Sequence, residues 1–233
     1  PIYATSTSVL FIERGTGHVS QYKLSDNTIK KISTTRVPGI YESSVVGGGA
    51  IAVAQRINDG TKQPETIILN LPITDGFDTE SSATYLPENI IGTAAKNNSL
   101  FYLVKTSRGS SGYIYDIKTN RTTQVLESPI ASWLPNWNSK VISLTTKPSA
   151  GFSGYSYTLD LAKNSLQKVF GPKNGLGVLF NHRGDYVLIT ESTQGSINTY
   201  LASATSSERL TGNVTSIAPD KCVWLPDGNL ALC

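Results

Sequence analysis

The only two cysteines of the chain, Cys222 and Cys233, are the residues whose spacing most clearly suggests chemistry. They flank the sequence Pro-Asp-Gly-Asn at 226–229, which is typical of a turn between two strands. Across such a hairpin residue 222 faces residue 233, with Cα atoms about 4.5–5.5 Å apart, within reach of a disulfide. We therefore predict a Cys222–Cys233 disulfide and an oxidising compartment. The alternative is a pair of small buried side chains in a reducing cytosol.

Other reactive side chains are few and scattered. The chain has two histidines, His18 and His182, both in predicted turns, which disfavours a His-based triad or a multi-His metal site. The acidic residues are dispersed, and most fall in predicted turns: Glu13, Glu42, Asp59, Asp116, Asp160, Asp185, Glu191 and Asp227. We predict no catalytic, cofactor-binding or metal-binding residues and no cofactor. An enzymatic activity is the less favoured expectation.

Composition narrows the class of protein. Charged residues make up 16% of the 233 residues, against about 25% in an average domain. The net charge of +3 comes without a clustered basic face, so we expect no nucleic-acid partner. No stretch reaches the roughly 18–20 apolar residues of a membrane span, so we expect no membrane insertion within the chain. Because Met is absent, we expect a mature or excised segment, in which any address label or membrane anchor would lie upstream of Pro1.

Short apolar segments separated by turn residues recur along the chain at intervals of about 40–50 residues. Apolar strands begin at 9, 50, 100, 141, 186 and 230. A strand-filled repeat of this length is typical of a β-propeller, in which each repeat is one four-stranded blade. We predict an all-β fold in a single domain, 1–233, with about five full blades and a partial sixth. The approximate blades are 1–40, 41–88, 89–130, 131–175, 176–216 and 217–233.

Several positions repeat at nearly constant spacing. Asp116 and Asp160 lie 44 residues apart, as do Asn120 and Asn164. The aromatic residues Trp133, Phe180 and Trp224 are separated by 47 and 44 residues, and each precedes a turn and an apolar strand. We predict that these aromatic residues are structural anchors that pack between neighbouring blades.

The residues of the last turn each favour the turn conformation for a physical reason. Pro226 presets φ, Asp227 can accept hydrogen bonds from the turn backbone, and Gly228 can take a left-handed conformation. We predict a structural role for all three.

Two copies of the motif carry a family resemblance. Phe180-Asn-His-Arg-Gly-Asp-Tyr-Val-Leu and Trp224-Leu-Pro-Asp-Gly-Asn-Leu-Ala-Leu resemble the aromatic-Ser-Pro-Asp-Gly-Lys repeat of TolB-type and related WD-repeat-like propellers. The resemblance implies a toroid of four-stranded blades whose innermost strands line a central channel. It implies a rigid platform for interactions with other molecules, and the motif brings with it no set of catalytic residues.

Two function classes remain open. The first is a non-enzymatic binding or scaffold propeller of an extracytoplasmic bacterial protein, located in the periplasm, at the cell surface or outside the cell, which holds a protein or a glycan partner. The second is a substrate-gating or regulatory propeller of a larger hydrolase. Closure is also open, because the chain can complete a ring with its C-terminal hairpin or form part of an incomplete ring of six or more blades.

Overall fold

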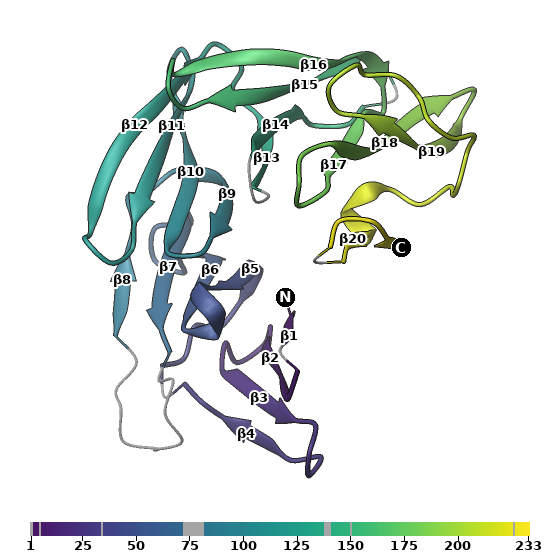
Figure 1. The fold of residues 1–233 in the computed structure, drawn as a ribbon. Coiled ribbons are helices and arrows are strands. Elements are labelled where there is room, and N and C mark those ends of the chain that lie inside the picture. Colours follow the sequence, from purple (N-terminus) through teal and green to yellow (C-terminus); the bar gives the residue numbers. More distant parts are fainter. Residues whose placement is uncertain are drawn as a thin grey trace. The chain divides into compact units, whose positions relative to one another are not determined.

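The computed structural model describes residues 2–4, 6–33, 35–71, 82–137, 141–149, 151–225 and 227–233. In these ranges the regular structure consists of strands and two three-residue 3-10 turns, η1 (Gly47–Gly49) and η2 (Pro219–Lys221). The strands form six antiparallel sheets that follow one another in chain order (Figure 1). No helix in the described ranges is long and apolar enough to cross a membrane.

The chain divides into two compact units, and the division falls within the third sheet. Unit 1 comprises 1–91, 95–100 and 115–121, and unit 2 comprises 92–94, 101–114 and 122–233. The expectation of one domain over 1–233 stays a prediction.

The first three sheets have four strands each, in which every strand pairs with the next one in the sequence. The first sheet contains β1 (Ile2–Ala4), β2 (Ser8–Ile12), β3 (Val19–Lys23) and β4 (Ile29–Lys31). The second contains β5 (Ile40–Val46), β6 (Ile51–Ile57), β7 (Pro64–Asn70) and β8 (Ala83–Tyr85). The third contains β9 (Ile90–Lys96), β10 (Ser99–Thr106), β11 (Gly109–Asp116) and β12 (Arg121–Ser128). The sequence of residues 72–87 has little pattern and predicts an irregular connection, and most of this stretch lies outside the described residues.

The last three sheets become progressively smaller. The fourth contains β13 (Trp133–Trp137), β14 (Ile142–Thr146), β15 (Ser153–Asp160) and β16 (Ser165–Asn174). The fifth contains β17 (Gly177–Phe180), β18 (Tyr186–Thr193) and β19 (Ser196–Ser203). The sixth contains β20 (Val223–Trp224) and β21 (Ala231–Leu232). The predicted fold class of four-stranded blades with a partial last blade is therefore observed.

The fifth sheet differs from the predicted full blade in its outer strand. The sequence predicts this outer strand at 208–211. The segment contacts β19 through the bridge Ala202–Arg209 and through two backbone bonds, from Leu210 N–H to the Leu201 carbonyl and from Ser203 N–H to the Glu208 carbonyl. A second isolated bridge joins Thr199 to Thr215. Two bridges take the place of a continuous ladder, because the chain here leaves the sheet and turns back toward η2.

Repeated Asp and Asn residues shape the outer turns. Asp116 Oδ1 accepts hydrogen bonds from the backbone N–H groups of Lys118 and Thr119, and Asp160 Oδ1 accepts the equivalent pair. Asn120 and Asn164 have φ of 55° and 49°. Asn tolerates this left-handed region better than most residues, which explains the repeat at 44 residues.

Each unit has a core between successive sheets. In unit 1 the apolar side chains of the first two sheets pack together, among them Val19, Ala52, Ile67 and Leu69. In unit 2 the cluster between the fourth and fifth sheets includes Phe170, Phe180 and Tyr200. Burying such side chains contributes roughly 1.5–3 kcal/mol each. The cores therefore lie between blades, and one sheet is not stable without its neighbour.

The predicted disulfide is present in the structure. Cys222 and Cys233 are bonded, with a Cα–Cα distance of 4.0 Å, at the open end of the β20–β21 hairpin. The hairpin register is the predicted one, since Val223 pairs with Leu232 and Trp224 with Ala231.

Loss of this cross-link should destabilise the last hairpin selectively. We expect Cys222→Ser with Cys233→Ser to lower the free energy of unfolding of this region by about 2–4 kcal/mol. Amide hydrogen exchange would show this as faster exchange at Val223–Leu232 than in β18. Alkylation under denaturing conditions should label no thiol before reduction and two after it, and two free thiols in unreduced protein would contradict the assignment.

Candidate binding site

A buried asparagine joins the fifth sheet to the last hairpin. The Asn181 side chain is 0% exposed, and its Oδ1 accepts hydrogen bonds from three backbone N–H groups of its own turn, those of Gly184, Asp185 and Tyr186. Its Nδ2 donates to Asp185 Oδ1 at 2.6 Å and to the Gly228 carbonyl at 3.0 Å. Asn181 therefore orders its own turn and also holds the turn of the next sheet.

Three more side chains cross the same boundary. Arg183 Nη1 donates to the Asp227 carbonyl and to Asn229 Oδ1, at 3.0 and 2.9 Å. The Trp224 indole N–H donates to the Leu179 carbonyl at 3.1 Å, and His182 Nε2 lies 3.2 Å from the Trp224 carbonyl. We call these contacts between the turn at 181–186 and the hairpin at 222–233 the inter-blade latch.

The hairpin turn presents its backbone to this latch. Asp227 Oδ1 accepts a hydrogen bond from Asn229 N–H at 3.1 Å, and this bond is the main reason why the pKa of Asp227 lies below its ordinary value. Gly228 has φ +72°, and a Cβ there would lie 3.1 Å from Asn181 Nδ2. Both the conformation and the close approach of Asn181 therefore favour glycine. Pro226, the other predicted turn residue, lies outside the described residues.

Ladder position separates Trp133 from the other two predicted aromatic anchors. Phe180 pairs with Val187 and Trp224 with Ala231, so each lies on the ladder with six residues between partners. Trp133 pairs with Thr146 at the far end of its hairpin. We therefore correct the predicted equivalence, because counting residues along the chain ignored the longer β13 strand. All three aromatic residues are nonetheless buried, with 1–6% of their surface exposed.

An apolar cavity of about 650 Å3 lies in unit 2, beside β13, β17 and η2. The fourth sheet and the segment after it contribute Leu134, Pro135, Asn136, Thr145, Pro148, Ser149 and Gly175. The fifth sheet and η2 contribute Gly177, Val178, Leu179, Thr190, Ser192, Ile197, Ala218, Pro219 and Asp220. Its size falls within the range of pockets that hold small molecules or single side chains of a partner.

A small residue on β17 leaves room beside the cavity. Gly177 pairs with Thr190 and Leu134 pairs with Thr145, and the two threonines form matching buried hydroxyl pairs with Thr199 and Ser156. Gly177 and Leu134 therefore hold equivalent positions in adjacent sheets, and β17 carries only hydrogen where β13 carries a leucine side chain. Pro219 packs against Gly177, and a Cβ on Gly177 would lie 3.0 Å from Pro219 Cδ.

Several bonds fix the walls of the cavity. Thr199 Oγ1 donates to the Ile217 carbonyl at 2.7 Å, which holds the chain just before η2 against β19. Cys222 follows η2 directly, so the disulfide secures the other end of the same wall. On the opposite side Gly175 N–H donates to the Ser149 carbonyl at 2.7 Å.

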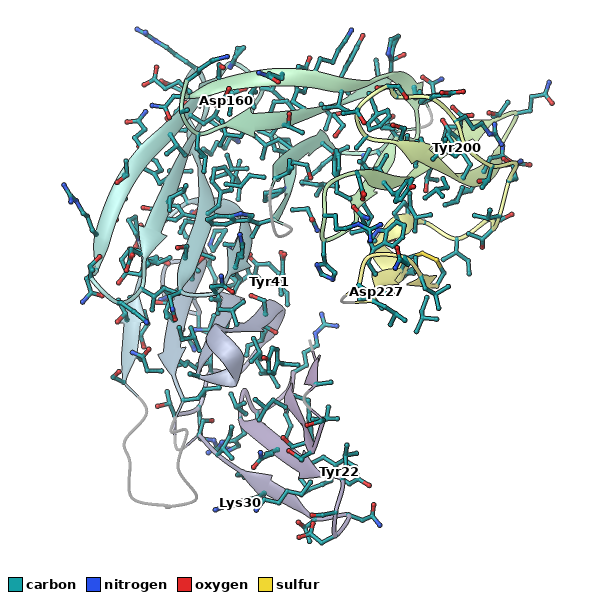
Figure 2. All side chains as sticks on the ribbon, in the orientation of Figure 1. Tyr22, Lys30, Tyr41, Asp160, Tyr200 and Asp227 are labelled. Atoms are coloured by element: carbon teal, nitrogen blue, oxygen red, sulfur yellow. A yellow bond between two sulfur atoms is a disulfide. The ribbon has the colours of Figure 1, made fainter. Side chains whose placement is uncertain are left out.

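A cationic cluster ties β16 to the fifth sheet. The Lys173 ammonium is bonded to Glu191 and lies 5.7 Å from the centre of the Tyr200 ring, while Arg209 Cζ lies 4.1 Å from the same ring. Burial is the largest single influence on Lys173 and lowers its pKa, but the hydrogen bonds and charges of Glu191 and Tyr200 together outweigh it, and the pKa is raised. Figure 2 shows Tyr200 on the fifth sheet and Asp227 in the hairpin turn of the latch.

The polar groups of the cavity are suited to binding. Thr145 and Thr190 use their hydroxyls within their own sheets, with Ser156 and Thr199. The carboxamide of Asn136 has no hydrogen-bond partner among the described residues, and it remains available to a ligand. Among the described residues that line the cavity, Asp220 is the one ionisable residue, and it forms an exposed ion pair of 3.2 Å with Lys221.

The predicted anchor and turn residues Phe180, Trp224, Asp227 and Gly228 meet in the latch, and none of them lines the cavity. Sequence reasoning missed the cavity residues altogether, and the only signal was the glycine at 177. The two histidines lie in different units; His18 Nδ1 is buried without a partner among the described residues. Within the described ranges no three His, Cys, Asp or Glu side chains gather as metal ligands would.

Comparisons with known proteins identify the fold. The chain matches the structure of TolB from Acinetobacter baumannii at 12% identity and a TM-score of 0.64, over 97% of this chain and 57% of that chain. It matches putative TolB from Agrobacterium tumefaciens at 14% identity and a TM-score of 0.62, over 97% and 84% of the two chains. The fold is thus a TolB-like β-propeller.

A hydrolase contains the same fold. Acylaminoacyl peptidase from Pyrococcus horikoshii matches at 9% identity and a TM-score of 0.62, over 93% of this chain and 39% of that chain. Neither protein-family models nor curated proteins gave a match. Identities this low describe the fold alone, and the chain spans little more than half the length of the first of these structures.

Removing the Asn181 side chain should weaken the latch. Asn181→Ala removes the side-chain partner of the Asp185 and Tyr186 N–H groups and of the Gly228 carbonyl, so we expect a loss of roughly 2–4 kcal/mol in the free energy of unfolding. Urea unfolding would measure it. Asn58→Ala is the matched control, because Asn58 caps an exposed turn within a single sheet, at Gly60 and Thr61, and it should cost no more than about 1 kcal/mol. Equal losses for both variants would refute the special role of Asn181.

Acid should loosen the same latch. The Asn181 amide, and next to it the Arg183 guanidinium, hold the pKa of Asp185 below its ordinary 3.8. A depressed native pKa stabilises the fold above the unfolded value, and this contribution is lost as the pH falls through the native pKa. The stability difference between the native protein and Asp185→Asn should therefore shrink below about pH 4. A constant difference between neutral and acidic urea titrations would count against it.

Proposed function

We propose that the chain is a non-enzymatic binding module of an extracytoplasmic protein, and that the cavity beside β13 and β17 holds part of a protein or glycan partner. The observation that carries the proposal is a largely apolar cavity of about 650 Å3 with few convergent polar groups. Binding pockets commonly combine an apolar lining with a small number of placed polar groups.

The mechanism is that of a rigid receptor. The latch and the disulfide secure the hairpin end of the η2 wall, and the Lys173–Glu191 pair links β16 to β18. A cavity whose walls are ordered before binding loses little conformational entropy when a ligand enters. The disulfide also supports an extracytoplasmic location, because such bonds persist in oxidising compartments.

A second candidate function has its own supporting observation. Acylaminoacyl peptidase from Pyrococcus horikoshii contains the same propeller fold in 39% of its chain. We therefore keep the hypothesis that this propeller controls access to a hydrolase domain of a larger protein. A hydrolase domain next to this segment in the parent open reading frame would favour the second function over the first.

Binding at the cavity can be tested with two pools of probes. The 15N-labelled protein with its disulfide intact is mixed with random hexapeptides, or with malto- and chito-oligosaccharides, and backbone amide shifts are followed by NMR. We expect one pool to shift the amides of Gly175, Gly177 and Ser192, because these line the cavity.

A cavity-filling variant provides the specificity control. Ala218→Phe places a ring in the cavity, and we expect it to weaken binding at least about tenfold, or 1.4 kcal/mol. Ala162→Phe, on an exposed turn of the fourth sheet, should bind as the native protein does. The proposal fails if neither pool shifts the cavity amides, or if Ala218→Phe binds unchanged.

A further inference from the structure

Strand β17 has a free edge. It is paired with β18 alone, since the order in this sheet is β17-β18-β19. The bond from Asn181 N–H to the Tyr186 carbonyl fixes the phase of this ladder, and the register pairs Leu179 with Leu188. Because hydrogen-bonded pairs alternate in an antiparallel ladder, Leu179 points its backbone groups at β18 and Val178 points its own away from it.

The backbone groups of Val178 are consequently available. No described residue makes a hydrogen bond to the N–H or carbonyl of Val178. Exposed strand edges of this kind pair readily with another extended chain.

The cavity lies beside this edge. Side chains alternate along a strand, so Gly177 and Leu179 belong to one face of β17 and Val178 to the other. Pro219 packs on the face of Gly177, whereas Val178 packs with the core between the fourth and fifth sheets. Three consecutive residues of β17 nevertheless line one cavity, together with Leu134 and Asn136 of β13. The backbone of β17 is therefore part of the cavity wall.

We propose that the occupant of the cavity is an extended peptide that adds a strand to β17. Its backbone pairs with the N–H and carbonyl of Val178, and two consecutive apolar side chains enter the spaces on either side of the strand. This inference rests on the proposed binding function and specifies its ligand. Strand addition uses the main chain for affinity and the flanking pockets for selection of side chains.

Charge indicates a further feature of the peptide. Asp220 lies at the η2 wall and is the one ionisable residue in the described part of the lining. Its present partner Lys221 is exposed, and an exposed ion pair exchanges partners at little cost. A Lys or Arg beside the two apolar residues of the peptide would complement Asp220. Asn136 supplies an amide for the peptide backbone on the opposite wall.

Backbone methylation distinguishes strand addition from simple apolar binding. The probe is acetyl-Thr-Val-Val-Lys-Thr-amide, measured by calorimetry against the disulfide-bonded chain. In an added strand every second N–H faces the protein, so we expect N-methylation at one valine to weaken binding at least about tenfold and N-methylation at its neighbour to change it less than about threefold. If both methylated peptides bind like the parent, strand addition is overturned.

Two protein variants test the same contacts from the other side. Val178→Pro removes the free N–H without removing a ladder bond, because this N–H does not face β18. We expect it to weaken binding of the peptide probe at least about tenfold, while the β18 amides stay protected from hydrogen exchange.

Asp220→Asn tests the charge. It should weaken binding of the lysine-containing peptide by about threefold and leave unchanged the binding of the same peptide with norleucine in place of lysine. Equal effects on both probes would refute the charge complementarity.

The outcomes also separate this inference from the proposed function. Oligosaccharides that shift the amides of Gly175, Gly177 and Ser192, with no shift from any peptide, would overturn the peptide and leave the binding module standing. No shift from either class would overturn both.

Discussion

The side chain of Asn181 is the contact on which the C-terminal part of unit 2 depends. An isolated two-stranded hairpin is at best marginally stable in water, and β20 and β21 have two residues each. The sixth sheet therefore owes its position to contacts outside itself. Asn181 supplies the most buried of these, because it satisfies its own turn and the Gly228 carbonyl with a single carboxamide. Arg183 adds an exposed hydrogen bond to the Asp227 carbonyl, and the Trp224 indole adds a partly buried one to the Leu179 carbonyl.

The latch also determines the shape of the cavity, although its predicted residues Phe180, Trp224, Asp227 and Gly228 do not line the cavity themselves. The η2 wall lies between Thr199, which holds the Ile217 carbonyl, and Cys222, which is bonded to the end of the hairpin. A hairpin that detached from the fifth sheet would move the Cys222 end of this wall with it. Stability of the last sheet and shape of the cavity are thus consequences of the same bonds.

Much of the fold follows from local sequence rules. The turn at 226–229 sets a hairpin register that places Cys222 opposite Cys233, and the register needs no knowledge of the rest of the chain. The Asp and Asn residues repeated at 44 residues likewise act within single turns, where Asp accepts backbone N–H groups and Asn takes a positive φ. Such features are predictable because their partners lie within a few residues of them.

The misplaced equivalence of Trp133 and the missed cavity have a common cause. Spacing along the chain measures the distance from repeat to repeat, whereas position in a sheet depends on cross-strand register. Aligned on the buried pairs of Thr145 and Thr190, Trp137, paired with Ile142, is the counterpart of Phe180, paired with Val187. The buried cross-strand pairs Gln55–Thr66, Thr145–Ser156 and Thr190–Thr199 escaped notice for the same reason, since each depends on register.

The cavity arises where the fifth sheet departs from the repeat in its outer strand. Two isolated bridges take the place of a continuous fourth strand, so the chain after β19 returns along Thr215 and Ile217 and places Pro219 against Gly177. The contact between glycine and proline is itself repeated, because Pro135 lies equally close to a Cβ on Gly92 in the preceding pair of sheets. What differs at the fifth sheet is therefore the path of the chain after β19, and departures from local consistency of this kind are expected at functional sites.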